Sequence, residues 1–311
     1  IGSTIQKNSS SNNYSDNFKT YKNGVENNPI NFGHGTKQEY NRPITLRELT
    51  EAISKAKDSA TGPDEIHYQM LKHLPTTPLL TLLQIMNDIF STGEFPPSWR
   101  EATVIPIPKP GKDATLPESY RPIALTNTIC KTMERIINSR LVWYLEKHNI
   151  ITDQQAGFRK GRSTYDQLIN FESKIRESLI RKNHLIAIFF DLEKAYDTTW
   201  KYGILRDLKK SGLEGLLPNF IAQFLNDRSF KVRIKNTLSD EFQQEMGVPQ
   251  GSILSPTLFT LKINDITKCV ESEMNCSLYV DDFLISCSAK DPKIAEQKLQ
   301  KVLDRLEVWC G

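Results

Sequence analysis

Several features that would place this 311-residue chain in a specialised class of protein are missing. Its five cysteines form no CxxC pair and have no histidines at zinc-ligand spacing, which argues against a disulfide framework and a zinc site. No run approaches the roughly 20 apolar residues that a membrane helix needs, and the first residues are polar, unlike a secretion signal. We therefore expect a globular protein of a reducing compartment that is neither secreted nor held in a membrane.

The chain also has little net charge. Its 40 Lys and Arg against 37 Asp and Glu leave only +3, which by itself is weak support for a polyanionic partner. The distribution is more informative, because one stretch carries basic residues with few opposing carboxylates. These residues are Lys109, Lys112, Arg121, Lys131, Arg135, Arg140, Arg159, Lys160 and Arg162. Such a bias favours a surface that faces phosphates.

Composition divides the chain into a polar lead-in and a patterned remainder. Residues 1–42 are rich in Asn, Ser, Lys and Tyr and lack aliphatic periodicity, which predicts a flexible linker. From there Thr45 and Glu48 have the spacing of a helix capping box, and apolar residues over 79–90 predict a second helix. Residues 43–100 are thus expected to form a helical N-terminal extension. Because the chain begins without Met, we expect it to derive from a longer protein.

Three later segments have strand-like patterns. Residues 102–108 alternate aliphatic residues with prolines, which predicts an exposed edge strand. The continuous apolar run over 185–191, LIAIFFD, predicts a strand buried on both faces. FKVRIK and EFQQEMGV (residues 230–235 and 241–248) read as the arms of a hairpin. Between the first two segments, an apolar stripe predicts a helix over 128–147.

The most distinctive string is YVDD, residues 279–282, with apolar residues on both sides. Adjacent carboxylates repel each other and are costly to bury unless a cation neutralises them, so Asp281 and Asp282 are candidate ligands of a hard divalent ion. A solvated Asp-Asp hairpin turn is the alternative interpretation.

A second acidic cluster is FFDLEKAYD, in which Asp191 ends the buried strand and Asp197 follows six residues later. Alone, Asp191 could equally be a strand-end cap or a metal ligand. Two strands of one sheet, each ending in Asp, would let Asp191 and Asp281 converge on two metal ions about 3.5–4 Å apart, as in phosphoryl-transfer enzymes. Magnesium suits such oxygen ligands.

FFDLEKAYD, GVPQGSILSP and YVDD occur in the order and spacing of motifs A, B and C of reverse transcriptases, which they resemble. YRPIALTNTICKTMERIINSRL and ITDQQAGFRKGRST are similar to the finger motifs of non-LTR retrotransposons, and TGPDEIHYQMLKHLP to their upstream extension. The resemblance is closest to the jockey-like group of arthropod elements and covers about residues 43–311.

This resemblance implies roles for individual residues around the acidic pair. Asp191 and Asp281 would be the metal-binding pair, Asp282 a weaker third carboxylate, and the main-chain carbonyl of Leu192 a further metal contact. Tyr196 would occupy the steric-gate position, where an aromatic ring excludes the 2′ hydroxyl of a ribonucleotide. A buried core tyrosine is the alternative for Tyr196.

The resemblance also assigns the glycine-containing motif GVPQGSILSP. Gly247 and Gly251 permit close backbone approach, and Pro249 fixes the turn that presents Gln250. Gln250 and Gly251 would line the nucleotide pocket, with Pro249 facing nucleic acid. A hairpin leading into a helix cap could give a similar string without this function.

Basic residues of the fingers complete the expected site. Arg159 is the first choice for the triphosphate contact, because a guanidinium grips phosphate oxygens with a rigid fork. Lys160 is a second nucleotide contact, and Arg162 is expected to face nucleic acid. Arg121 either faces nucleic acid or forms a structural salt bridge.

As a whole, the resemblance implies an α+β right-hand polymerase with fingers over 101–184 and a palm over 185–311. The palm would hold a ferredoxin-like antiparallel sheet backed by helices and a fingers insertion at about 205–245. The implied activity is RNA-directed DNA polymerisation with an RNA template, a DNA primer and dNTPs. The implied cofactor is a pair of Mg²⁺ ions, with Mn²⁺ as a substitute, and the implied location is a nuclear and cytoplasmic ribonucleoprotein.

Some parts of the family pattern are not found in this sequence. The lysine-bearing motif, primer grip and helical thumb do not occur before Gly311, nor do the endonuclease and cysteine-rich regions of such elements. We therefore expect a fragment, truncated before the thumb, that extends primers weakly. The rival interpretations are a co-opted RNA-binding protein without catalysis, another palm enzyme such as a viral RNA polymerase or nucleotide cyclase, and a group II intron or retron enzyme.

Overall fold

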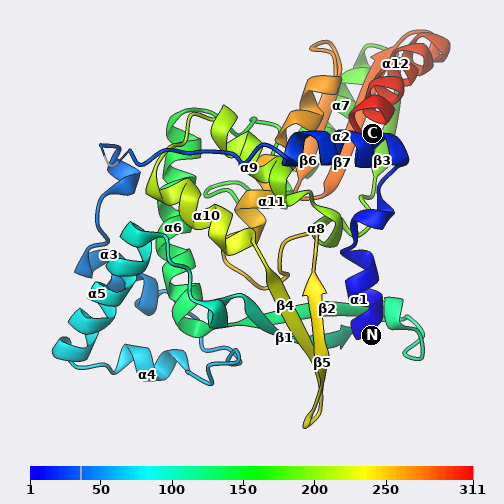
Figure 1. The fold of residues 1–311 in the computed structure, drawn as a ribbon. Coiled ribbons are helices and arrows are strands. Elements are labelled where there is room, and N and C mark those ends of the chain that lie inside the picture. Colours follow the sequence, from blue (N-terminus) through cyan, green and yellow to red (C-terminus); the bar gives the residue numbers. More distant parts are fainter. Residues whose placement is uncertain (36, 311) are drawn as a thin grey trace.

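Two β-sheets surrounded by helices organise the chain in the computed structural model, which describes residues 1–35 and 37–310 (Figure 1). The first sheet has four strands in the order β2-β1-β4-β5 and the second has three in the order β3-β7-β6. The strands of the first sheet are β1 Glu101–Pro108, β2 Tyr120–Thr126, β4 Arg228–Ile234 and β5 Thr237–Gln244. Those of the second sheet are β3 His184–Phe190, β6 Asn275–Tyr279 and β7 Asp282–Ala289.

The proline-containing strand β1 lies inside the first sheet, so the prediction of an edge strand is wrong. It pairs with β2 along its whole length but with β4 only from Glu101 to Val104. Pro106 lies beyond this short pairing, opposite Pro122 of β2. Proline has no N–H group to donate, but Pro106 lies outside the pairing of β1 with β4, so the hydrogen bonds between these two strands are kept. This is how two strands that contain proline fit into the sheet. The predicted hairpin is confirmed as β4 and β5.

Strand β3 lies at one edge of the second sheet and is not buried on both faces, so that prediction is also wrong. Its residues are half-buried or exposed, and Phe189 is 71% exposed. Side chains of β7 alternate between two helices. Phe283 and Ile285 join the core formed with α12 (Pro292–Cys310), whereas Ser288 bonds Ser178 of α7 (Thr164–Ile180). Three strands are described here, and the ferredoxin-like form stays a prediction.

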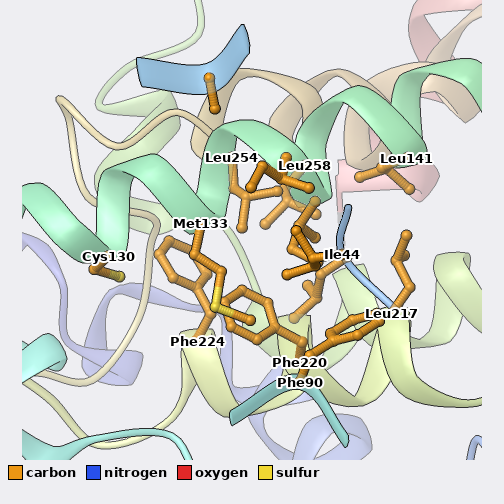
Figure 2. Packing of buried hydrophobic residues seen from close by; sticks show 14 of the residues in the cluster. Ile44, Phe90, Cys130, Met133, Leu141, Leu217, Phe220, Phe224, Leu254 and Leu258 are labelled. Carbon is orange, nitrogen blue, oxygen red and sulfur yellow. The ribbon is translucent and has the colours of Figure 1, made fainter. Parts of the chain in front are cut away.

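A large helical core packs around α6 (Thr128–Lys147), whose bounds match the prediction. Figure 2 shows Met133 of this helix among aromatic side chains of its neighbours. The surrounding helices are α3 Leu46–Ser54, α5 Thr76–Thr92, α10 Leu216–Leu225 and α11 Ser255–Ile263. The capping box of α3 is present as predicted, with Thr45 and Glu48 each bonding the other's main chain.

The expectation of a flexible linker over residues 1–42 is contradicted, because this segment contains α1 (Gly2–Asn8) and α2 (Asp16–Glu26). Its few apolar side chains find partners elsewhere in the chain. Phe32 is 1% and Tyr40 3% exposed, and both belong to the large core. Order here comes from tertiary burial rather than from local periodicity, so composition alone could not reveal it.

The remaining elements are short or connect the two sheets. The helices are α4 Tyr68–Lys72, α8 Ala195–Thr198 and α9 Lys201–Lys210. Single 3₁₀ turns occur at Ser11–Asn13, Glu39–Asn41, Pro97–Trp99, Pro117–Ser119 and Asn264–Cys269. Within the described residues, no helix has the length and apolar character needed to cross a membrane.

Candidate active site

The acidic residues predicted from the sequence meet at one end of the three-stranded sheet. Strand β3 ends at Phe190, which pairs with Phe283 of β7, so Asp191 leaves the strand beside Asp282. Tyr279 pairs with Asp282 across β6 and β7, which leaves Val280 and Asp281 in the connection between them. We call residues 279–282 the carboxylate turn. Antiparallel pairing thus brings together acids that lie 90 residues apart in the sequence.

Asp191 and Asp281 leave the same end of the three-stranded sheet, and the charge of Asp191 acts on Asp281. Burial raises the pKa of Asp281, and the charges of Asp282 and Asp191 raise it further against a backbone hydrogen bond that lowers it. Asp281 is half-buried, whereas Asp191 and Asp282 are exposed. Like charges held together in this way favour a bound cation, since a divalent ion stabilises the ionised forms that repulsion and burial disfavour.

The donor set matches a hard cation, but it has two close members rather than three. Among residues 1–35 and 37–310, no group of three or more His, Cys, Asp or Glu side chains has the geometry of a metal site. Asp191 and Asp281 therefore stay the predicted metal-binding pair, and Asp282, which lies beside Asp191 in the strand register, stays a predicted further donor. Oxygen-only ligands with room for water and substrate phosphates are typical of Mg²⁺ sites.

The loop that carries Gln250, residues 247–252 and here called the glycine loop, is bonded to the segment after β3. The N–H groups of Gly247 and Val248 donate to the carbonyls of Thr199 and Tyr196, both at 2.8 Å. A Cβ at position 247 would lie 2.5 Å from the Tyr196 carbonyl oxygen, so the contact requires glycine. The glycine loop and the segment after β3, whose motifs were predicted to share a site, are therefore joined by main-chain hydrogen bonds.

The side chain of Gln250 is fixed by a carboxylate. Its Nε2 donates to Oδ1 of Asp197 at 3.1 Å, and its main-chain carbonyl accepts from the Ala124 N–H of β2 at 2.7 Å. Burial raises the pKa of Asp197, which the Gln250 hydrogen bond and nearby Lys194 partly offset. Gly251 touches the same strand, because a Cβ there would lie 2.4 Å from the Ala124 carbonyl oxygen. Gln250 is thus held between the two sheets.

A model of the reverse transcriptase (RNA-dependent DNA polymerase) family matches residues 107–310, the region that contains both the carboxylate turn and the glycine loop. The chain belongs to the reverse transcriptase family. This confirms the resemblance that the three motifs suggested.

Its similar proteins include polymerases of insect mobile elements. Over 281 residues it is 34% identical to a probable RNA-directed DNA polymerase from transposon BS of Drosophila melanogaster. Over 275 residues it is 34% identical to the RNA-directed DNA polymerase from mobile element jockey of Drosophila funebris. Each match covers 86% of this chain but 30% of the relative, so the chain spans less than a third of their length. A more distant relative, 25% identical over 232 residues, is a Pol polyprotein from the R2 element of Popillia japonica.

In this member of the family, Tyr196 lies between the carboxylate turn and the core. Its ring stacks on Phe259 with centroids 5.0 Å apart and planes at 16°. Burial raises the pKa of its hydroxyl, and the charge of Asp281 adds to this effect. The predicted steric-gate residue is therefore half-buried and adjacent to the acidic pair, a place that also suits a core tyrosine.

The structure contradicts the prediction for Arg159. Its guanidinium makes two hydrogen bonds to the Glu146 carboxylate, at 2.8 and 2.6 Å, and two more to the carbonyls of Thr152 and Gln155. Four of the five N–H groups of an arginine are thereby engaged, which leaves no fork for a phosphate. Arg159 instead ties the end of α6 to the following loop.

The other basic residues of the fingers differ in how free they are. Lys160 and Arg121 are both exposed, the latter on strand β2. Arg162 forms an ion pair with Asp153 at 2.9 Å, with 38% of its side chain exposed. Pro249 is buried beside Gln250. An exposed ion pair contributes little to stability, so Arg162 can exchange its partner for a phosphate at small cost.

Three residues to which the motif analysis gave no role hold this site together. Asp197 fixes Gln250, Glu134 of α6 bonds the end of the glycine loop, and Gln155 bonds the carboxylate turn. All three lie within sequence segments that resemble motifs of the family. Nothing in the sequence marked their partners, because each contact joins residues at least 53 positions apart.

Proposed function

We propose that this chain catalyses RNA-directed DNA synthesis, adding dNTPs to a DNA primer on an RNA template. The observation that carries the proposal is that strand pairing brings Asp191 and Asp281 to one end of the three-stranded sheet, where the charge of Asp191 acts on the half-buried Asp281. Chemistry with a divalent cation gives such a pair a use that packing alone does not. The relatives' names support RNA as template and DNA as product.

In this proposal the two sheets correspond to fingers and palm. The palm is the β3-β7-β6 sheet with α12 and α7 packed against it, and the fingers contain the β2-β1-β4-β5 sheet. The β4–β5 hairpin, which lies within the predicted insertion of about 205–245, joins the fingers sheet through β1. The carboxylate turn and Gln250 then lie where the two regions meet.

Asp191 and Asp281 are the residues that would hold a pair of Mg²⁺ ions, with the Leu192 carbonyl and Asp282 as further oxygen donors. When bound, these ions would lower the pKa of the primer 3′ hydroxyl and neutralise negative charge on the triphosphate. The protein's own contribution is to bring both carboxylates to one end of the three-stranded sheet. Their exposed edges leave room for substrate oxygens.

Residues around the pair would select and orient the nucleotide. The ring of Tyr196, fixed by its stack on Phe259, would press on the sugar edge and exclude a 2′ hydroxyl. Gln250 and Gly251 would line the nucleotide pocket from the other side, with the exposed Arg121 toward nucleic acid; Pro249 is buried and is not proposed as a contact, contrary to the prediction from the sequence. Lys160 replaces Arg159 as the proposed triphosphate contact because it is exposed and Arg159 is engaged.

A primer-extension assay with an RNA template, a DNA primer, dNTPs and Mg²⁺ tests the proposal. The parent chain should extend the primer, and Asp281→Asn and Asp191→Asn should each lower the rate by about a thousandfold, since several kcal/mol of charge stabilisation are lost. Circular dichroism and thermal unfolding serve as controls, because neither substitution removes a packing contact. Extension at the parent rate by either variant would overturn the proposed chemistry.

A further inference from the structure

We propose that Gln155 is a positioning residue for catalysis: its buried carboxamide fixes the main chain of Val280 and thereby aims Asp281. The inference rests on the proposed polymerase function and extends it to a residue that touches no substrate. Gln155 belongs to the loop that follows α6, 125 positions from the turn that it contacts.

The carboxamide of Gln155 bonds both polar groups of one residue. Its Oε1 accepts from the Val280 N–H at 3.0 Å and from the Gly157 N–H at 2.7 Å, while its Nε2 donates to the Val280 carbonyl at 3.4 Å. The side chain is 0% exposed. A neutral amide offers both a donor and an acceptor, so it can hold both groups of Val280 without adding charge beside the carboxylates.

Val280 needs this support because its backbone is in a region that valine avoids. Its φ is +61°, which for a β-branched residue is an outlier that persists only when the surroundings over-determine it. Two close contacts restrict the backbone on both sides of the turn. The Ala156 N–H donates to the Leu278 carbonyl at 2.9 Å, and a Cβ on Gly157 would lie 2.5 Å from the Val280 nitrogen.

The orientation of Asp281 depends directly on Val280, because the two residues are consecutive. If the hydrogen bonds between Gln155 and Val280 are lost, the φ angle of Val280 can relax to a negative value. The carboxylate of Asp281 then moves relative to Asp191. Small displacements of a reacting group are expensive, since a misplacement of about 1 Å can cost about a hundredfold in rate. The nucleotide contacts proposed for Tyr196 and Gln250 lie on other elements and are not affected directly.

The kinetic test compares the parent with Gln155→Leu and Gln155→Asn. Gln155→Leu keeps most of the volume but loses all three hydrogen bonds, and Gln155→Asn keeps an amide on a side chain shorter by one methylene. We expect kcat to fall at least about tenfold in Gln155→Leu and less in Gln155→Asn, with the KM for dNTP within about threefold of the parent. Gln154→Leu is the matched control, because the Gln154 side chain is exposed and should be replaceable.

A second-site variant separates positioning from a general packing role. Glycine adopts positive φ without penalty, so Val280→Gly removes the strain that Gln155 opposes. It should restore part of the kcat lost in Gln155→Leu. A KM that rises as much as kcat falls, or no rescue by Val280→Gly, would overturn the assignment of Gln155 as a positioning residue.

A binding measurement keeps this inference separate from the proposed function. Titration with Mn²⁺ alone, followed by electron paramagnetic resonance, reports the acidic pair without any turnover. Gln155→Leu should bind Mn²⁺ several-fold more weakly than the parent, and Gln154→Leu should match it. If the parent extends no primer but this difference is present, the polymerase proposal fails while the role of Gln155 stands; equal Mn²⁺ binding in a folded Gln155→Leu refutes that role.

Discussion

The carboxylate turn and the glycine loop are both held by one buried side chain from a distant element, but the two side chains differ in charge. The turn is held by the neutral amide of Gln155, and burial together with the charges of Asp282 and Asp191 raises the pKa of its Asp281. The loop is held by Glu134, which is 0% exposed and accepts from the Ser252 hydroxyl and from the N–H groups of Ile253 and Leu254.

The difference shows how this chain separates structural from chemical charge. Glu134 is a carboxylate whose oxygens are used by protein donors, as a buried charge requires. The charged form of Asp281 is disfavoured by burial and by Asp282 and Asp191, and a main-chain hydrogen bond offsets this only in part. Arg159 and Lys160 repeat the contrast among basic residues, since Arg159 is engaged by Glu146 and Lys160 is exposed. Engaged charges support the fold, and free ones remain for ligands.

The sharpest test of this contrast is Glu134→Ala, which should destabilise the protein without removing a reacting group. At the end of the glycine loop the Ser252 hydroxyl and the Ile253 N–H lose their acceptor, and each unsatisfied buried group costs about 1–3 kcal/mol. We expect the free energy of unfolding to fall by about 3 kcal/mol or more, measured by urea denaturation. A stability equal to that of Asp281→Asn would break the distinction between the two carboxylates.

Tyr196→Ala tests the residue that lies between the two regions. Loss of the ring should leave the acidic pair in place and open the sugar edge, so that ribonucleotides begin to be incorporated. We expect the preference for dNTP over rNTP, measured as a ratio of kcat/KM values, to fall by about 30-fold, in the range typical of a lost steric contact. An unchanged sugar preference would show that Tyr196 is only a core residue.

A double-mutant cycle between Asp197 and Gln250 examines how the glycine loop is aimed. If Asp197 acts through the Gln250 carboxamide, Asp197→Ala should raise the KM for dNTP by about tenfold in the parent but hardly at all in a Gln250→Ala background. Asp207→Asn is a suitable control, because Asp207 is a half-buried acid of α9 paired with Lys262. Additive effects of the two alanine substitutions would argue for independent roles.

The smallest predicted effect is a pH dependence of stability in the metal-free protein. Because the folded pKa of Asp281 is raised, the folded state binds its proton more readily than the unfolded chain, whose Asp titrates near about 3.9. Its stabilising contribution is complete below that value and is lost as pH rises through the folded pKa. Asp281→Asn should flatten this part of the profile, as seen in thermal unfolding across the acidic range; an identical profile in both proteins would contradict the raised pKa.

Local patterns made a good part of this fold predictable. The helix 128–147, the capping box at Thr45 and the β4–β5 hairpin each depend on signals within a few turns of chain, and all are confirmed. The meeting of Asp191 with Asp281 was also predictable, since both follow strands that a shared sheet brings together.

Contacts between distant residues were not predictable in the same way. The hydrophobic periodicity of a sequence cannot show that β1 has a neighbouring strand on each side, nor that Glu146 forms an ion pair with Arg159. The polar lead-in was misjudged because its few aromatic residues, such as Phe32, are buried by partners elsewhere in the chain. Gln155 was overlooked because the reason for its presence, the strained backbone of Val280, exists only in the folded structure.

Anomalous diffraction from crystals grown with Mn²⁺ tests the central claim most directly. If the carboxylate pair is a metal site, anomalous peaks will lie between Asp191 and Asp281 with both carboxylates as ligands, and they will vanish in Asp281→Asn crystals. Peaks bound by only one of these residues, or none at the end of this sheet at saturating Mn²⁺, would contradict the account.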